Sequence, residues 1–281
     1  MKTQVRLLLL LSFIFVQTQA QLIPNAGFEN WGTKNLYEEP NEFFTSNGYA
    51  YGNIGKGNVS KTSSASHGAY GIKLETLATE NDTIAGSLII GIPAENGIKG
   101  GIPYTGTPDS ISFYAKYTIQ PSDMAYFIIA FKKEGEYIAQ AICTFSDSQE
   151  TYKRFKIATS LSAENPPDSL VAFITSSRMD PPRIPESTLW LDSITMLHSD
   201  EQIPNSNFEE WVTLETQEPA DWQTLNMVSV GLGKQSATPS TSSHEGTYAI
   251  RIESVPTSYG ANFGYITNGQ FGNDGPPKGG L

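Results

Sequence analysis

The sequence has few cysteine and histidine residues, the side chains that thiol catalysis and disulfide formation require. It contains one cysteine, Cys143, and three histidines in 281 residues. A single cysteine cannot form an internal disulfide, and Cys143 lies in the run 137–145, whose odd positions form an apolar face. We therefore expect a buried structural thiol, because catalytic thiols lie in polar, partly exposed settings near a base.

Basic residues are also scarce relative to acidic ones. The sequence has 18 Lys and Arg against 29 Asp and Glu, for a formal net charge of −11. We find no cluster of Lys and Arg along the chain of the kind from which nucleic acids and anionic membranes gain affinity, so neither is an expected partner. An acidic surface suits divalent cations and neutral ligands such as sugars.

Long hydrophobic runs are confined to the N-terminus. Residues 1–20 have the three parts of a signal peptide: the positive Lys2 and Arg6, the apolar run Leu7 to Val16, and the small-residue site Thr18-Gln19-Ala20. A membrane-spanning helix needs about 20 apolar residues, and no later segment approaches that length. We expect cleavage after Ala20, no membrane span, and a secreted or cell-surface protein whose formal net charge falls to −13 once Lys2 and Arg6 are removed.

The rest of the chain is rich in Gly, Pro, Ser, Thr and aromatic residues and lacks helical periodicity. Its apolar residues form short runs bounded by turn residues, which is typical of strands. The clearest runs are 70–75, 87–92, 110–117, 125–131, 137–145, 152–157, 170–176 and 189–196. About eight strands in this length predict an all-β fold with two packed sheets, a jelly-roll β-sandwich.

Alternation within two runs assigns side chains to faces. Ile111, Phe113, Ala115 and Tyr117 are expected to point inward, with Tyr114 and the other even positions outward. The run 189–196 alternates only if a bulge intervenes near Asp192 and Ser193. The run 125–131 is apolar on both faces, which is typical of a central strand.

The chain contains an internal repeat. Residues 23–31 and 203–211 share the pattern I-P-N-x-x-F-E-x-W, and residues 66–75 are echoed by 244–253. The spacing of 180 residues is too long for a solenoid, so each copy should begin a domain. We expect a β-sandwich at 21–198, a linker at 199–202 and a partial second copy at 203–281. Because the second copy has no counterpart of the strands at 110–196, we expect it to be truncated and the chain to continue beyond Leu281.

Four stretches carry a resemblance to known families: 25–31, 66–75, 100–117 and 189–194. The pattern resembles the carbohydrate-metabolism domains of bacterial secreted proteins, and it is similar to the family 4/9 carbohydrate-binding modules. Thr107 departs from it, since many members have Arg before the Pro, so no role is carried over there. The resemblance implies a jelly-roll fold that binds glycans, and proteins with such tandem domains often end in a type IX secretion sorting signal.

The resemblance also implies a structural calcium ion. In the binding modules, the acid of the first motif and the Asp of the closing strand help to hold it, which corresponds here to Glu29 and Asp192. Carboxylate oxygens are the ligands that calcium prefers. The alternative is that Glu29 caps a turn and Asp192 accepts hydrogen bonds from backbone amides.

Catalytic residues are harder to identify. Glu38, Glu39 and Glu42 lie in a Pro-containing segment and are more typical of a solvated surface than of a glycosidase, which needs two carboxyl groups about 5–9.5 Å apart across the bond. His67 and His244 recur beside a glycine without a Ser or Cys nucleophile motif, which favours a turn-stabilising role.

Sugar recognition relies on aromatic rings flanked by polar groups. The candidates outside obvious core positions are Tyr49, Tyr51, Tyr104, Tyr114 and Trp190, although any one of them can instead belong to the core. Our leading hypothesis is a non-catalytic glycan-binding or adhesive module that takes a neutral polysaccharide. A structural spacer that displays a downstream domain is the alternative, and a glycoside hydrolase is the third.

Overall fold

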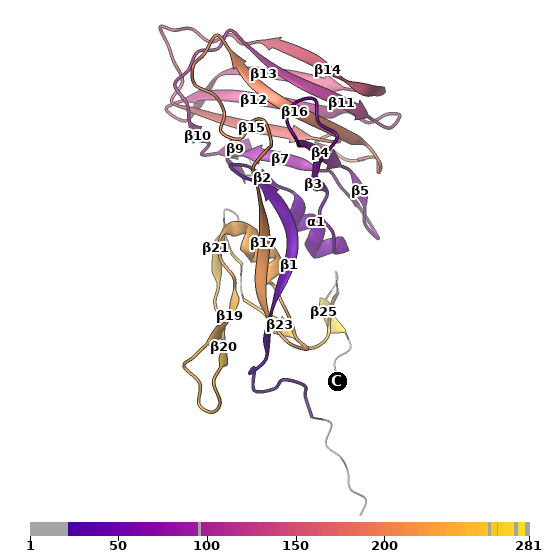
Figure 1. Ribbon diagram of the computed structural model, residues 1–281, viewed down its shortest axis with the longest axis vertical. Helices are drawn as coiled ribbons and strands as arrows, with labels where there is room; N and C mark the ends of the chain where they lie inside the picture. Colours follow the sequence, from indigo (N-terminus) through magenta and orange to yellow (C-terminus); the bar gives the residue numbers. More distant parts are fainter. Residues whose placement is uncertain (1–21, 95–96, 258–259, 263, 273–274, 279–281) are drawn as a thin grey trace, which may run out of the picture.

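The computed structural model describes residues 22–94, 97–257, 260–262, 264–272 and 275–278. The expected signal peptide lies outside these ranges. The first repeat forms a two-sheet sandwich at the top of Figure 1, and two long strands run side by side from it to the second repeat.

One sheet of the sandwich has five strands. Its order is β14 (Ser148–Ala158), β11 (Ser110–Thr118), β16 (Thr188–Leu197), β4 (Gly71–Glu75) and β3 (Val59–Thr62). All neighbouring pairs are antiparallel. The closing strand β16 therefore lies between β11, from the middle of the first repeat, and β4, from nearer its beginning.

The other sheet has six strands. Its order is β13 (Glu136–Phe145), β12 (Ala125–Lys133), β15 (Ser169–Thr175), β7 (Ser87–Ile90) and β2 (Phe44–Thr45), and β10 (Ile102–Pro103) also pairs with β15. Two small hairpins complete this repeat, β5 (Leu77–Ala78) with β6 (Thr83–Ile84) and β8 (Ile92–Ala94) with β9 (Gly97–Lys99). The chain crosses repeatedly between the two sheets, so the all-β jelly-roll sandwich predicted from the sequence is confirmed, and all eight predicted runs form strands.

The core lies between the two sheets, where the alternating apolar positions meet. Ile111, Phe113 and Ala115 are fully buried, and Tyr117 packs at the edge of the same cluster. The ring of Phe113 stacks on Phe127 of the opposite sheet at 4.0 Å between centroids. The predicted faces of β11 are therefore confirmed.

The bulge expected on the closing strand is also present. The register between β11 and β16 shifts between Ser112 and Tyr114, and Ser193 has a φ of 52°. The extra residue lets Leu191 and Ile194 both face the core. Cys143 is half-buried on β13 rather than fully buried, because this strand lies at the edge of its sheet.

The second repeat reproduces the first elements of the first repeat in the same order. The series β1 (Trp31–Pro40), β2, α1 (Asn47–Ile54), β3, β4 corresponds to β17 (Trp211–Pro219), β18 (Gln223–Thr224), α2 (Asn226–Ser229) with η1 (Val230–Leu232), β19 (Ala237–Ser240), β20 (Ala249–Ile252). Short strands follow: β21 (Val255–Thr257), β22 (Gly260–Asn262), β23 (Ile266–Thr267), β24 (Gln270–Gly272) and β25 (Gly275–Lys278). The repeat in the sequence is thus a repeat in structure.

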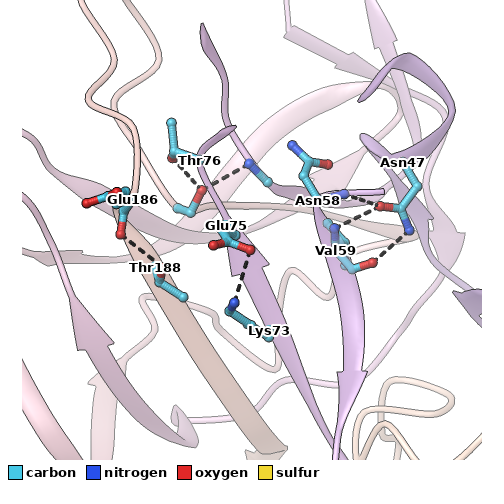
Figure 2. A network of polar contacts seen from close by, with 10 residues as sticks. Asn47, Asn58, Val59, Lys73, Glu75, Thr76, Glu186 and Thr188 are labelled. Carbon is cyan, nitrogen blue, oxygen red and sulfur yellow. Dashed lines mark hydrogen bonds and ion pairs between the residues drawn. The ribbon is translucent and has the colours of Figure 1, made fainter. Parts of the chain in front are cut away.

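A buried asparagine fixes the same corner of both repeats. The Asn47 side chain accepts hydrogen bonds from the N–H groups of Asn58 and Val59 and donates to the Val59 carbonyl (Figure 2). Asn226 makes the same pair of contacts with the backbone of Ala237. A buried amide whose donors and acceptor are bonded holds the segment from helix to strand in one conformation.

The two repeats are joined by the antiparallel pair β1 and β17. Trp31 lies opposite Pro219, and Trp211 lies opposite Pro40, so the pairing is nearly symmetric about its centre. This pairing carries the beginning of each repeat to the other repeat. Ile203 and Phe208, at the start of the second repeat, are buried in the core of the first sandwich, and Phe208 packs against Phe43 at 5.7 Å.

The start of the first repeat makes the matching contact with the second. Phe28 packs against Trp222 at 5.2 Å between ring centroids. The backbones of the two motifs agree closely, with φ of 47° and 56° at Asn25 and Phe28 and 48° and 57° at Asn205 and Phe208. The division at residues 199–202 therefore separates the repeats in sequence, but residues 203–208 complete the first core.

Candidate functional site

The loop 63–70 between β3 and β4 folds over the outer face of the five-stranded sheet. The buried carboxylate of Asp192 accepts hydrogen bonds from the N–H groups of Ser66 (2.6 Å) and His67 (2.8 Å). Lys116 donates to the Ser64 hydroxyl, and the Tyr152 hydroxyl donates to the Ser64 carbonyl, both at 2.7 Å. Bonds from three strands thus hold the loop in place on the sheet.

A hollow of about 420 Å³ lies on this face beside the loop. It is lined by His67 from the loop, Ser112 and Tyr114 from β11, Arg154 from β14, and Ser193 and Thr195 from β16. The rings of His67 and Tyr114 lie 4.6 Å apart, and the Arg154 guanidinium donates to the Ser112 hydroxyl at 3.3 Å. The hollow therefore combines one aromatic platform, one fixed cation and several hydroxyl groups, a combination found in sites for polar ligands.

Trp190 lies on the same face, next to Lys116 across the sheet. The ammonium groups of Lys116 and Lys73 lie 5.0 Å and 5.8 Å from the centre of its ring, within cation–π distance. Tyr152 contacts the same Lys116 at 5.3 Å. The indole is half-buried, and its two lysines add positive charge to the row of aromatic rings.

Two of the five predicted aromatic residues, Tyr114 and Trp190, thus lie on the same face, with Tyr114 in the lining of the hollow and Trp190 outside that lining, and the other three lie elsewhere. Tyr104 is 1 % exposed and packs against Phe131 in the core, while its hydroxyl donates to the Glu201 carbonyl. The prediction that Tyr104 lies outside the core is wrong, because the chain after β16 covers it. Tyr49 and Tyr51 belong to helix α1; Tyr49 is 64 % exposed, and Tyr51 packs against Tyr37.

A second hollow, of about 340 Å³, lies on the outer side of the six-stranded sheet. Tyr49 and Phe173 contribute rings to it, Thr175 and Ser87 contribute hydroxyls, and Asp82 and Arg178 contribute charges. This hollow contains only one of the predicted residues. Its other members come from loops and from the strands β6, β7 and β15, whose outward positions the sequence pattern did not single out.

The two residues predicted to hold calcium bind different loops. Glu29 accepts hydrogen bonds from the N–H groups of Thr247 and Tyr248 in the second repeat, whereas Asp192 binds the loop 63–70 of the first. The backbone hydrogen bonds that the alternative expects of Asp192 are present. Among the described parts of the chain there is no group of three or more His, Cys, Asp or Glu side chains placed to hold a metal ion. The calcium ion stays a prediction.

Glu39, one of the three acids considered for catalysis, has a raised pKa. Burial raises the pKa of Glu39 to about 8, although the Thr45 hydroxyl donates a hydrogen bond that favours the ionised form. Glu39 lines neither hollow described above. Glu38 pairs with Lys61 at 2.6 Å, so the neighbouring acids have separate structural contacts.

Of the residues that line the first hollow, sequence reasoning assigned only Tyr114 to a binding site, and Arg154 and His67 are the cation and the ring that it missed. Arg154 lies in the predicted strand run 152–157, and alternation of that run with Tyr114 opposite would have placed the guanidinium beside the ring. The position of His67 depends on the packing of its loop against Asp192, which no local pattern reveals.

Neither a protein-family model nor a curated protein matches the sequence. Solved structures resemble it in fold. A Bacteroides thetaiotaomicron protein assigned provisionally as a glycoside hydrolase is 18 % identical, with 62 % of this chain and 71 % of that chain covered and a TM-score of 0.46. A family 16 carbohydrate-binding module is 16 % identical, with 49 % and 84 % covered and a TM-score of 0.31.

A third similar structure is the family 11 carbohydrate-binding module of a cellulosomal cellulase from Clostridium thermocellum. It is 14 % identical, with 60 % of this chain and 87 % of that chain covered and a TM-score of 0.31. At such identities and scores the activities of these proteins do not transfer to this chain.

Proposed function

We propose that the protein binds a polysaccharide or glycan without cleaving it, through the outer face of the five-stranded sheet. The observation that carries the proposal is the hollow in which the Tyr114 ring lies with Arg154 and His67, on the same sheet face as Trp190. Aromatic rings bind the apolar faces of sugars, and the adjacent hydroxyls and guanidinium supply hydrogen bonds.

The lining of the hollows supports binding over hydrolysis. Glycoside hydrolysis in its usual form needs two carboxyl groups on opposite sides of the bond. Within the described residues, no carboxyl group lines the first hollow and only Asp82 lines the second. The proposal is therefore a non-catalytic module, and its place on an exported protein follows from the signal peptide that we predict at residues 1–20.

The alternative function is a structural spacer. It is favoured by the reciprocal contacts between the repeats, because β1 and β17 and the two exchanged motifs connect them over a long interface. In the described residues no helix is long and apolar enough to cross a membrane.

The test uses the chain from residue 21 to residue 281 and a panel of soluble and insoluble glycans. Retention on a glycan and the release of reducing sugar are measured together. We expect retention without release, with affinities of roughly micromolar to millimolar, since a shallow face buries little area. Trp190→Ala and Tyr114→Ala should weaken retention, and Tyr137→Ala, an exposed ring on β13 of the other sheet, should not.

Sugar release would assign the protein to the enzymes. Absence of retention on every glycan would favour the spacer. Retention that is lost in Tyr49→Ala and unchanged in Trp190→Ala would move the site to the second hollow. Circular dichroism melts of each variant exclude unfolding as the cause.

A further inference from the structure

Positive charge gathers on the proposed binding face although the chain as a whole is acidic. Lys73, Lys116, Arg154 and Lys156 come from three different strands, β4, β11 and β14, of the five-stranded sheet. Lys73 and Lys116 flank Trp190, and Arg154 lies opposite Tyr114. These residues are far apart in the sequence, so the cluster becomes apparent only when the strands pair in the sheet.

Two of these cations have no acidic partner in the described part of the molecule. Arg154 donates to the Ser112 hydroxyl, and Lys116 donates to the Ser64 hydroxyl and contacts two aromatic rings. Lys73 differs, because it forms an ion pair with Glu75 at 3.0 Å. The positive charge beside Tyr114 is therefore available to a ligand, whereas that of Lys73 is compensated.

The nearby carboxylates point to other partners. Asp192 is fully buried and accepts hydrogen bonds from two loop N–H groups and from the Ser193 hydroxyl. Glu209 accepts hydrogen bonds from the N–H groups of Ala69 and Tyr70. Neither lines the hollow, so an anion bound there would meet Arg154 without a facing carboxylate.

Resting on the proposed function, we infer that the hollow binds an acidic sugar, a uronic acid within a polysaccharide. The carboxylate of the sugar pairs with the Arg154 guanidinium, a fork of N–H donors that matches a carboxylate in shape. The face of the sugar ring packs against Tyr114, and the hydroxyls of Ser193 and Thr195 bond to those of the sugar. The hollow volume lies within the range of about 300–1,000 Å³ that is usual for ligand sites. The inference departs from the neutral polysaccharide expected from net charge alone.

The experiment compares two polymers with the same sugar backbone, one with free carboxylates and one with these groups neutralised as methyl esters. Affinity electrophoresis or isothermal titration calorimetry measures binding of residues 21–281 to polygalacturonate and to its fully methyl-esterified form, without divalent cations. Alginate and hyaluronan extend the test to other uronates. We expect binding to at least one of these uronates. If that uronate is polygalacturonate, methyl esterification should weaken binding at least about tenfold, and a rise from 50 to 200 mM salt should weaken it further.

The decisive variant is Arg154→Gln, with Lys153→Gln as its matched control. Lys153 is the preceding residue of β14 and lies opposite the inward-facing Ala115, so it carries the same charge away from the hollow. Arg154→Gln should lower uronate binding at least about tenfold, Arg154→Lys should restore part of it, and Lys153→Gln should leave it unchanged.

Four outcomes overturn the inference. Equal binding of polygalacturonate and its ester would leave a glycan-binding protein without the preference for acidic sugars. An equal loss in Lys153→Gln, or equal binding of dextran sulfate, would indicate unspecific attraction of polyanions. Binding to neutral glycans but to none of the three uronates would leave the proposed function standing and the inference wrong, whereas no binding to any glycan in the full panel would contradict the proposed function itself.

Discussion

Glu29 and Glu209 occupy equivalent positions in the two repeats, and each binds a loop of the other repeat. Glu29 accepts hydrogen bonds from the N–H groups of Thr247 (2.9 Å) and Tyr248 (3.2 Å). Glu209 accepts them from Ala69 (2.9 Å) and Tyr70 (3.1 Å). The repeats therefore exchange their opening motifs, and the loop that borders the proposed site is held from one side by Asp192 and from the other by the second repeat.

The first prediction concerns the core position that the second repeat supplies. Phe208 is fully buried in the first sandwich, so Phe208→Ala in residues 21–281 should lower its free energy of unfolding by about 3–5 kcal/mol. Phe28→Ala, the equivalent change in the first repeat, should cost less, because Phe28 is half-buried against Trp222. Urea unfolding followed by hydrogen exchange of β11 and β16 separates the two effects. If Phe28→Ala rather than Phe208→Ala destabilised β11 and β16, the second repeat would not supply this core position of the first sandwich.

The second prediction concerns the loop itself. Glu209→Gln keeps the size of the side chain but weakens the charge-assisted hydrogen bonds to the loop. The amides of Ala69 and Tyr70 should then exchange hydrogen several-fold faster, while those of Ser66 and His67, bound to Asp192, change less. Unchanged exchange at Ala69 and Tyr70 would show that Glu209 does not hold the loop in solution.

The third prediction is a pH dependence of stability due to Glu39. Its pKa is raised from 4.5 to about 8, chiefly by burial. Between these values the folded state keeps a proton that the unfolded state has released. Stability therefore falls as the pH rises from about 4.5 to about 8, at no more than about 1.4 kcal/mol per pH unit, and this group contributes no slope outside that window.

Removing the carboxyl group tests this assignment. Glu39→Gln should flatten the decline in melting temperature over the window. Glu218→Gln is the matched control, because Glu218 accepts the equivalent hydrogen bond, from Thr224, in the second repeat. A decline that persists in Glu39→Gln would assign the pH dependence to another group.

The fourth prediction is the calcium ion. A ligand bound only by the folded state raises the melting temperature by mass action, so calcium should stabilise residues 21–281 and a chelator should reverse the shift. Because Glu29 and Asp192 bind loops of different repeats, Glu29→Gln and Asp192→Asn report on separate sites. If neither calcium nor the chelator changes the melting temperature, the protein has no structural calcium ion.

Much of the sandwich was predictable because alternation within a single strand determines which side chains face the core. Alternation along 110–117 gave the faces of β11, and the interrupted alternation at Asp192 and Ser193 gave the bulge. Strand β1 was missed, because Trp31–Pro40 pairs with β17 rather than covering a core and so shows no alternation of apolar residues.

The candidate site was only partly predictable, since it depends on contacts between distant segments. Tyr114 and Trp190 face outward by alternation, but their nearness follows from the pairing of β11 with β16. Tyr104 was misassigned because its ring packs against Phe131 and its hydroxyl bonds to Ser199 and Glu201, nearly one hundred residues later in the chain. The repeated motif identified the segment that contains Phe208, but no local sequence pattern indicated that this side chain packs in the core of the first repeat.

The most direct test of the proposed site is a hydrogen-exchange footprint of residues 21–281 with and without a saturating glycan that the protein retains. The account predicts slower exchange in the loop 63–70, in β11 near Tyr114 and in β16 near Trp190, with no change in β12 and β13. Protection confined to the six-stranded sheet would contradict it.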